Sequence, residues 1–130
     1  TMMGSGGFIV LDDAQCVVRH TMTLARFYAH ESCGQCSPCR EGTGWMYKIL
    51  KNIEYGKGKM SDIDLLWDIQ RKIEGNTICP LGDAAAWPVA AAIRHFRDEF
   101  EWHVKNPEES QTRNYGLAHY ADPIHVPTTA

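Results

Sequence analysis

The segment Cys33-Gly34-Gln35-Cys36-Ser37-Pro38-Cys39 places three of the chain's five cysteines in a C-x2-C-x2-C pattern. A fourth, Cys79, lies far downstream and is followed by Pro80, while Cys16 lies upstream in the 130-residue sequence. An odd number of cysteines, three of them this close together, argues against the disulfide framework of a secreted domain. The pattern instead indicates metal binding in a reducing compartment.

The spacing of these cysteines suits an iron–sulfur cluster. A cubane 4Fe–4S cluster offers four iron corners, so one tight loop can occupy three of them and a distant cysteine the fourth. We therefore predict a cluster held by four cysteines, Cys33, Cys36, Cys39 and Cys79. The chemical alternative is a tetrahedral zinc site with the same ligands, although zinc modules usually present two C-x2-C pairs, each on its own turn. Buried or disulfide-bonded cysteines fit the compact run less well.

Apolar residues repeat at helical spacing on both sides of the two cysteine loops. The repeats predict four helices, at residues 14 to about 30, about 39 to 54, 61 to about 73, and 83 to about 104. We expect Asp12 or Asp13 to cap the first helix, Asp83 to cap the fourth, and Pro88 to reset the start of the fourth. Because an even number of helices separates the loops, both loops should lie at the same end of a bundle.

The two ends of the chain differ from this helical pattern. Residues 6–11 form a short apolar run that predicts a strand, and residues 106–130 predict an extended tail. The expected fold is therefore an all-α four-helix bundle over residues 12–105, with a strand remnant in residues 1–11 and a tail after residue 105. A glycine-rich start that runs straight into a strand suggests a fragment of a longer polypeptide.

Other residues carry weaker signals. Cys16 is alone in a predicted helix, where a cysteine is usually a small core residue. The histidines form no H-x3-H pair and are expected at the surface or in caps: His20, His30, His95, His103, His119 and His125. His30-Glu31 could hydrogen-bond around the cysteine loop, and Arg40 either offsets the negative charge of a cluster or is simply solvated. The aromatic residues at helical spacing are expected in the core: Trp45, Trp67, Trp87, Phe96 and Phe100.

Composition excludes several classes of function. The formal net charge of −3 gives no electrostatic reason to expect nucleic acid or an anionic membrane as partner. No apolar run approaches the ~20 residues of a membrane-spanning helix, and the first residues lack the pattern of a signal peptide. The glycines of residues 4–7 precede a strand and do not join a strand to a helix, so they fail the nucleotide-binding motifs. The loop cysteines also lack an evident base and orienting group for nucleophilic catalysis.

Three segments resemble one known family. Residues 30–42 (HESCGQCSPCREG) are similar to the cluster motif of the NADH-binding flavoprotein, or F subunit, of respiratory complex I. Residues 78–89 (ICPLGDAAAWPV) resemble the fourth-ligand loop of that family, and residues 94–100 (RHFRDEF) its last helix. The likeness covers roughly residues 1–105. Diaphorase subunits of NAD-linked hydrogenases and formate dehydrogenases share the same module.

The resemblance implies an electron-transfer module of NADH:quinone oxidoreductase, in which a 4Fe–4S cluster takes single electrons from FMN and passes them to further clusters. It implies that residues 1–11 are the last strand of a small β-grasp-like domain, and that FMN and NADH bind to an upstream domain. The chain by itself should therefore be inactive with NADH. The implied partners are other peripheral-arm subunits, and the implied location is the cytoplasmic face of the membrane, without insertion into it.

Overall fold

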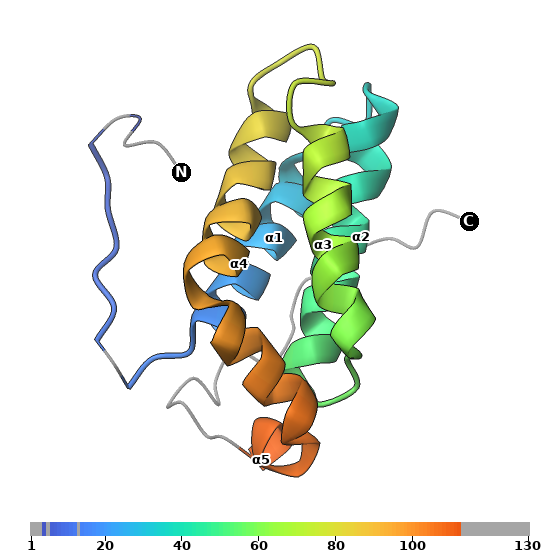
Figure 1. Ribbon diagram of the computed structural model, residues 1–130. Helices are drawn as coiled ribbons and strands as arrows, with labels where there is room; N and C mark the ends of the chain where they lie inside the picture. Colours follow the sequence, from blue (N-terminus) through green and yellow to red (C-terminus); the bar gives the residue numbers. More distant parts are fainter. Residues whose placement is uncertain (1–3, 5, 13, 113–130) are drawn as a thin grey trace.

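The structure, a computed structural model, describes residues 4, 6–12 and 14–112 as five helices with connecting loops. The helices are α1 (Val17–Glu31), α2 (Ser37–Glu54), α3 (Met60–Ile73), α4 (Leu81–Lys105) and α5 (Pro107–Thr112). Figure 1 shows α1 to α4 running side by side, with α5 below their lower end. The prediction of an all-α bundle built on four substantial helices is confirmed.

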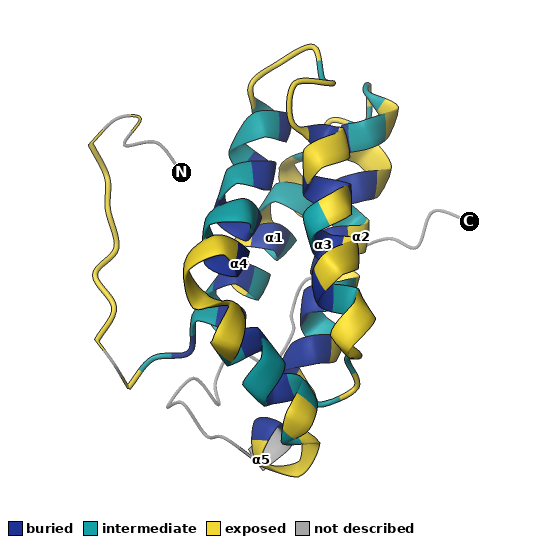
Figure 2. Cartoon of the chain, in the orientation of Figure 1, coloured by how far each residue is buried: buried dark blue, intermediate teal, exposed yellow. Residues whose placement is uncertain are grey.

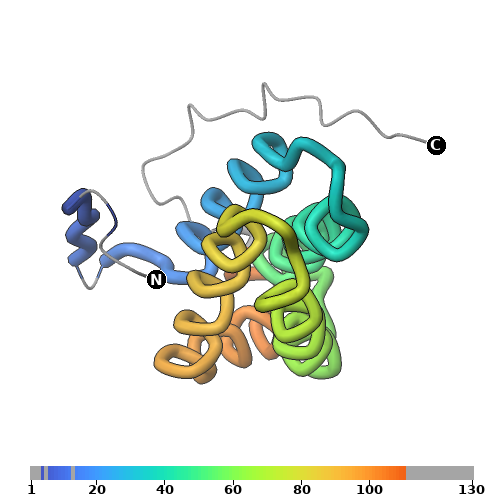
Figure 3. Tube along the Cα trace, turned by 90° about the horizontal axis from the view of Figure 1, so that it is seen from above, coloured from blue at the N-terminus to red at the C-terminus, as the bar shows by residue number. Residues whose placement is uncertain are grey.

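The four long helices surround one apolar core. Helix α1 packs against α2 and α4, and α3 packs against the same two helices. Helices α2 and α4 also contact each other. Figure 3, which looks down the bundle, shows this arrangement of the four helices, and Figure 2 shows their buried faces turned inward. The core therefore lies between all four helices, from one end of the bundle to the other.

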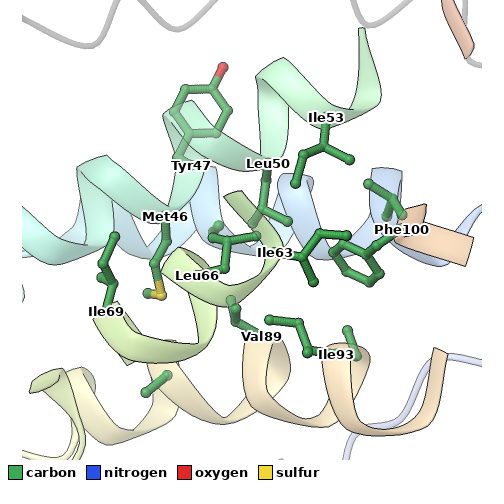
Figure 4. Close-up of a cluster of buried hydrophobic side chains, with 14 of the residues drawn as sticks. Met46, Tyr47, Leu50, Ile53, Ile63, Leu66, Ile69, Val89, Ile93 and Phe100 are labelled. Carbon is green, nitrogen blue, oxygen red and sulfur yellow. The ribbon is translucent and has the colours of Figure 1, made fainter. Parts of the chain in front are cut away.

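The core side chains come from all four long helices, and Figure 4 labels the larger ones on α2, α3 and α4. Each of the larger ones contributes about 1.5–3 kcal/mol when it is fully removed from water. Those labelled in the figure with almost no exposure are Met46, Leu50, Ile53, Ile63, Leu66, Val89 and Phe100. The predicted aromatic core is only partly right, because Trp45 and Phe96 are exposed while Phe100 is fully buried.

Helix α1 starts later than the sequence predicts. Its N-cap is Cys16, whose sulfur accepts a hydrogen bond from the Arg19 N–H at 3.4 Å. Asp12 instead closes a turn before the helix, since its carbonyl oxygen accepts from the Gln15 N–H at 3.2 Å. Asp13 lies outside the described residues. The thiol of the buried Cys16 thus takes the place of the expected carboxylate as the cap.

Helix α4 corrects a second prediction. It begins at Leu81 and continues through Pro88, with Pro80 as its N-cap residue, so neither Asp83 nor Pro88 sets its start. A proline inside a helix removes one backbone hydrogen bond, but here its ring is buried in the core interface. The break in α4 falls at Phe96, with φ −135° and ψ 32°. This bend redirects the last part of α4 across the lower end of the bundle in Figure 1.

The ends of the chain also differ from the sequence expectations. Residues 7–12 have no regular secondary structure and are exposed, and the described residues include no strand with which they could pair. Because a strand needs a partner for its backbone hydrogen bonds, the predicted strand and its domain assignment remain a prediction. Residues 107–112, expected in an extended tail, form α5. Residues 113–130 lie outside the described part.

A close approach between α2 and α3 gives the first testable prediction. A Cβ atom at Gly42 would lie 2.7 Å from Ile73 Cδ1, whereas one at Gly44 would meet nothing within 4 Å. We expect Gly42→Ala to lower the free energy of unfolding by about 1 kcal/mol through overpacking. Gly44→Ala is the matched control and should raise it by up to ~1 kcal/mol through helix propensity. Denaturant titration followed by circular dichroism measures both, and equal effects would contradict this helix contact.

Candidate metal centre

The first cysteine loop, residues 32–36, joins α1 to α2 at the upper end of the bundle in Figure 1. Gly34 has φ +81°, a left-handed conformation that glycine adopts without steric cost. Arg40 reaches back from the first turn of α2, where its Nη1 donates to the Gly34 carbonyl at 2.7 Å and its Nη2 to Ser37 Oγ at 3.3 Å. Arg40 is thus neither free nor merely solvated: it braces the loop and adds positive charge beside it.

The three sulfurs of this loop differ in their exposure. Cys33 is exposed, Cys36 is half-buried, and Cys39 is buried in the first turn of α2. Cys36 is the N-cap residue of α2, and Ser32 Oγ lies 3.2 Å from Cys39 Sγ, within hydrogen-bond distance. A helix N-terminus carries partial positive charge. An anionic metal centre held by these sulfurs would therefore be stabilised by the end of α2.

The second cysteine loop, residues 74–80, joins α3 to α4. Thr77 Oγ1 donates to the Cys79 carbonyl at 3.0 Å, which fixes the backbone beside the exposed Cys79. The loop packs closely on the first turn of α4, since a Cβ at Gly82 would lie 2.6 Å from Thr77 Cγ2. Cys79 consequently stands just before the N-terminus of α4, as Cys36 stands before that of α2.

The two loops meet at one end of the bundle. The backbone N–H of Ile78 donates to Cys36 Sγ at 3.4 Å, across 42 positions of sequence. Figure 1 shows the α3–α4 connection and the start of α2 together at the top of the molecule. The predicted placement of both loops at the same end is therefore confirmed.

The donor set fits an iron–sulfur cluster better than a zinc ion. Tetrahedral zinc with Zn–S bonds of about 2.3 Å holds its sulfurs about 3.8 Å apart. Among the described residues, one group of three potential ligand atoms comes within 4.8 Å of one another, and it contains none of the loop cysteines. In a cubane cluster each cysteine binds a different iron, which sets the sulfurs farther apart. The four thiols suit the larger iron–sulfur cluster. Cys36 has the Ile78 N–H beside its sulfur, and Cys39 has the Ser32 hydroxyl.

Cys16 lies away from these loops. It is 2% exposed at the start of α1, and burial, assisted by the nearby Glu54 charge, raises the pKa of its thiol to about 12. This agrees with the expectation of a core cysteine outside the loop ligand set. His30 is also separate from the cysteines, because its Nδ1 pairs with Glu31 Oε1 at 3.0 Å on the exposed surface.

Sequence reasoning missed several polar residues of the core, among them Glu54, His103 and Ser110. His103 is fully buried, although the histidines were expected mainly at the surface or in caps. A signal was available, because His103 lies three positions after Phe100 and so shares its inward face of α4. Of the other histidines, His95 is exposed and His20 partly buried, while His119 and His125 lie outside the described residues.

Comparison with known proteins supports the same chemistry. The chain is 51% identical over 104 residues to the F subunit of NADH-quinone oxidoreductase from Rickettsia typhi, and it is 51% identical over the same length to that from Rickettsia massiliae. Each match covers 80% of this chain and 25% of the relative. It therefore spans about a quarter of the length of these curated relatives. Crystal structures of an NAD+-reducing [NiFe]-hydrogenase are similar in the H2-reduced and air-oxidized states, with TM-scores of 0.69 and 0.70 at 35% identity. They cover 73% of this chain and 16% or 17% of the hydrogenase chain.

The family match includes both cysteine loops. No helix in the described residues has the length and apolar character required to cross a membrane. Residues 19–103, which run from the first turn of α1 to the buried His103, match the NADH-ubiquinone oxidoreductase-F iron-sulfur binding region. With this match over the greater part of the chain, and with two cysteine loops that meet at one end of the bundle, the chain belongs to the family of F-subunit iron–sulfur binding regions.

Proposed function

We propose that this chain is the electron-transfer module of an NADH:quinone oxidoreductase and holds a 4Fe–4S cluster through four cysteines, Cys33, Cys36, Cys39 and Cys79. When bound, such a cluster accepts and releases one electron at a time. The observation that carries the proposal is the hydrogen bond from the Ile78 N–H to Cys36 Sγ, because it brings the fourth cysteine's loop against the first three.

The surrounding residues have distinct roles in this proposal. The N-termini of α2 and α4 and the Arg40 guanidinium supply positive charge that offsets four thiolates. The Ile78 N–H and the Ser32 hydroxyl lie beside cysteine sulfurs, where hydrogen bonds of this kind raise the reduction potential of a cluster. These groups tune the centre without binding it.

Exposure at the cysteine loops suits exchange of electrons with neighbouring carriers. Cys33 and Cys79 are exposed, and Ile78, which precedes Cys79 in the second loop, is 85% exposed. We propose that a flavin-bearing part of the whole protein donates electrons at this surface and that other peripheral-arm subunits accept them. NADH and FMN would bind in that flavin-bearing part. The complex would work at the cytoplasmic face of the membrane.

A second candidate is the corresponding module of an NAD+-reducing hydrogenase. Its support is the similarity to the hydrogenase structures, at 35% sequence identity. The quinone reductase relatives are 51% identical to this chain, so the quinone reductase remains the first candidate. A zinc-binding structural domain is distinguished from both by its chemistry, because a zinc site brings no inorganic sulfide.

The ligand assignment predicts the effect of single cysteine changes. Replacing any of the loop cysteines, Cys33, Cys36, Cys39 or Cys79, with Ala should abolish the cluster or convert it to a form with less iron. Cys16→Ala is the matched control and should keep the full iron and sulfide content, because Cys16 lies at the far end of α1. Chemical analysis of iron and sulfide after anaerobic reconstitution measures each variant. Loss of iron in Cys16→Ala alone would overturn the assignment.

Removal of the cluster should leave the helices folded. The apolar core is packed independently of the cysteine loops, with Met46, Leu50 and Ile53 fully buried. We expect the chelator-treated chain to keep its helical circular dichroism, while residues 31–41 and 76–83 exchange their amide protons faster. An unfolded spectrum after iron removal would show instead that the metal supplies most of the folding energy.

Electron entry gives a further prediction. NADH delivers a two-electron hydride, so a flavin must convert it into single electrons before a cluster can accept them. The reconstituted chain should be reduced by dithionite but stay oxidised with NADH alone, and adding the flavin-bearing part should restore reduction by NADH. Stopped-flow absorbance of the cluster measures both reactions. Rapid bleaching by NADH without a flavoprotein would contradict the proposed division of labour.

A further inference from the structure

A buried polar cluster lies at the end of the bundle opposite the cysteine loops. It joins the start of α1, the end of α2 and the last part of α4. Cys16 is 2% exposed, Glu54 3% and His103 0%. Cys16 Sγ lies 3.2 Å from His103 Nε2 and 3.6 Å from Glu54 Oε2. None of these side chains is a proposed ligand of the iron–sulfur cluster.

The hydrogen bonds around His103 fix which ring nitrogen carries its proton. Ser110 Oγ lies 2.6 Å from His103 Nδ1, and it donates its own hydrogen to the Glu54 carbonyl oxygen at 2.6 Å. A carbonyl oxygen only accepts, so the hydroxyl proton is committed to it and the Ser110 oxygen accepts from the Nδ1–H. The lone pair of Nε2 therefore points at Cys16. This is the arrangement of a metal-binding histidine, whose second nitrogen donates to a neighbouring oxygen.

A carboxylate completes a set of three ligand atoms. One atom each of Cys16, Glu99 and His103 lies within 4.8 Å of the other two, the one such group among the described residues. Glu99 is held in place because its Oε1 accepts from the Val17 N–H at 2.9 Å. Tetrahedral zinc separates a sulfur ligand from a nitrogen ligand by about 3.6 Å, so the 3.2 Å between Cys16 and His103 needs only a small expansion.

We propose that Cys16 Sγ, His103 Nε2 and the Glu99 carboxylate bind a divalent metal ion of the zinc class, with the Glu54 carboxylate beside the fourth position. Sulfur, nitrogen and oxygen donors together are the ligands that zinc takes in proteins. On binding, the Cys16 thiol gives up its proton to solvent and its sulfur bonds to the metal. This metal site is independent of the iron–sulfur cluster and of the proposed function.

The charges of the site support a divalent ion. A thiolate and two carboxylates carry three negative charges, which a divalent cation and the Arg19 guanidinium together balance. Arg19 Nη1 lies 3.9 Å from Glu54 Oε1, on the more exposed side of the cluster. Buried charges are costly unless they are paired or coordinate a metal. A bound ion accounts for the presence of this many ionisable groups around the buried Cys16 and His103, with Glu99 half-buried beside them.

The zinc content of the chain that holds its iron–sulfur cluster tests the proposal. Samples with full iron and sulfide are equilibrated with buffered zinc, and zinc per chain is measured by inductively coupled plasma mass spectrometry. We expect about one zinc per wild-type chain, in line with a single three-ligand site. Cys16→Ala and His103→Gln should lose it. Thr21→Val is the matched control and should keep it, because the buried Thr21 hydroxyl donates to the Val17 carbonyl of its own helix.

Two further measurements keep the test independent of folding defects in the variants. Co2+ added to the wild-type chain should give the thiolate-to-cobalt charge-transfer absorption of a single cysteine ligand. Ser110→Ala should keep the fold and weaken zinc binding about tenfold, because it removes the oxygen that orients His103. A wild-type chain that holds no zinc beyond its iron, or variants that bind zinc as tightly as wild type, would overturn the proposal and leave a purely hydrogen-bonded cluster.

Discussion

The antiparallel pair of α2 and α3 controls the rest of the structure, because it returns the chain to the end where α2 began. Two cysteine loops that are distant in sequence then face each other, and the Ile78 N–H reaches Cys36 Sγ. The same return directs the N-termini of α2 and α4 toward one place, where their partial positive charges add. The contact between Gly42 and Ile73 shows how closely the two helices must approach near this end.

Most of the fold follows from local patterns in the sequence. Apolar periodicity identifies the four long helices, and counting helix traversals places both cysteine loops at one end. The failures are positions where tertiary packing overrides a local rule. Pro88 continues a helix with its ring buried at the core interface, and the buried Cys16 caps α1 with its thiol.

The two polar sites differ in how far sequence can reveal them. The cysteine loops are local motifs, so spacing alone indicates their chemistry. The polar residues around Cys16 come from α1, α2, α4 and α5, and each is an ordinary residue in its own segment. His103 lies beyond the break in α4 at Phe96, and no residue type marks that break in advance. Ser110 reaches the polar cluster from α5, which the sequence assigned to an extended tail. Such a site becomes visible only when the packing is known.

The separation of the two sites has a physical consequence. Between them lies a core made largely of apolar side chains such as Leu50, Leu66 and Val89. At the loop end, exposed sulfurs and two helix N-termini allow solvent and dipoles to absorb a change of charge. At the other end the groups are buried, so an unbalanced charge there is far more costly. Distant sites without shared partners contribute nearly additively to stability. The bundle can therefore vary its charge at the loop end while the buried end keeps a fixed and balanced arrangement.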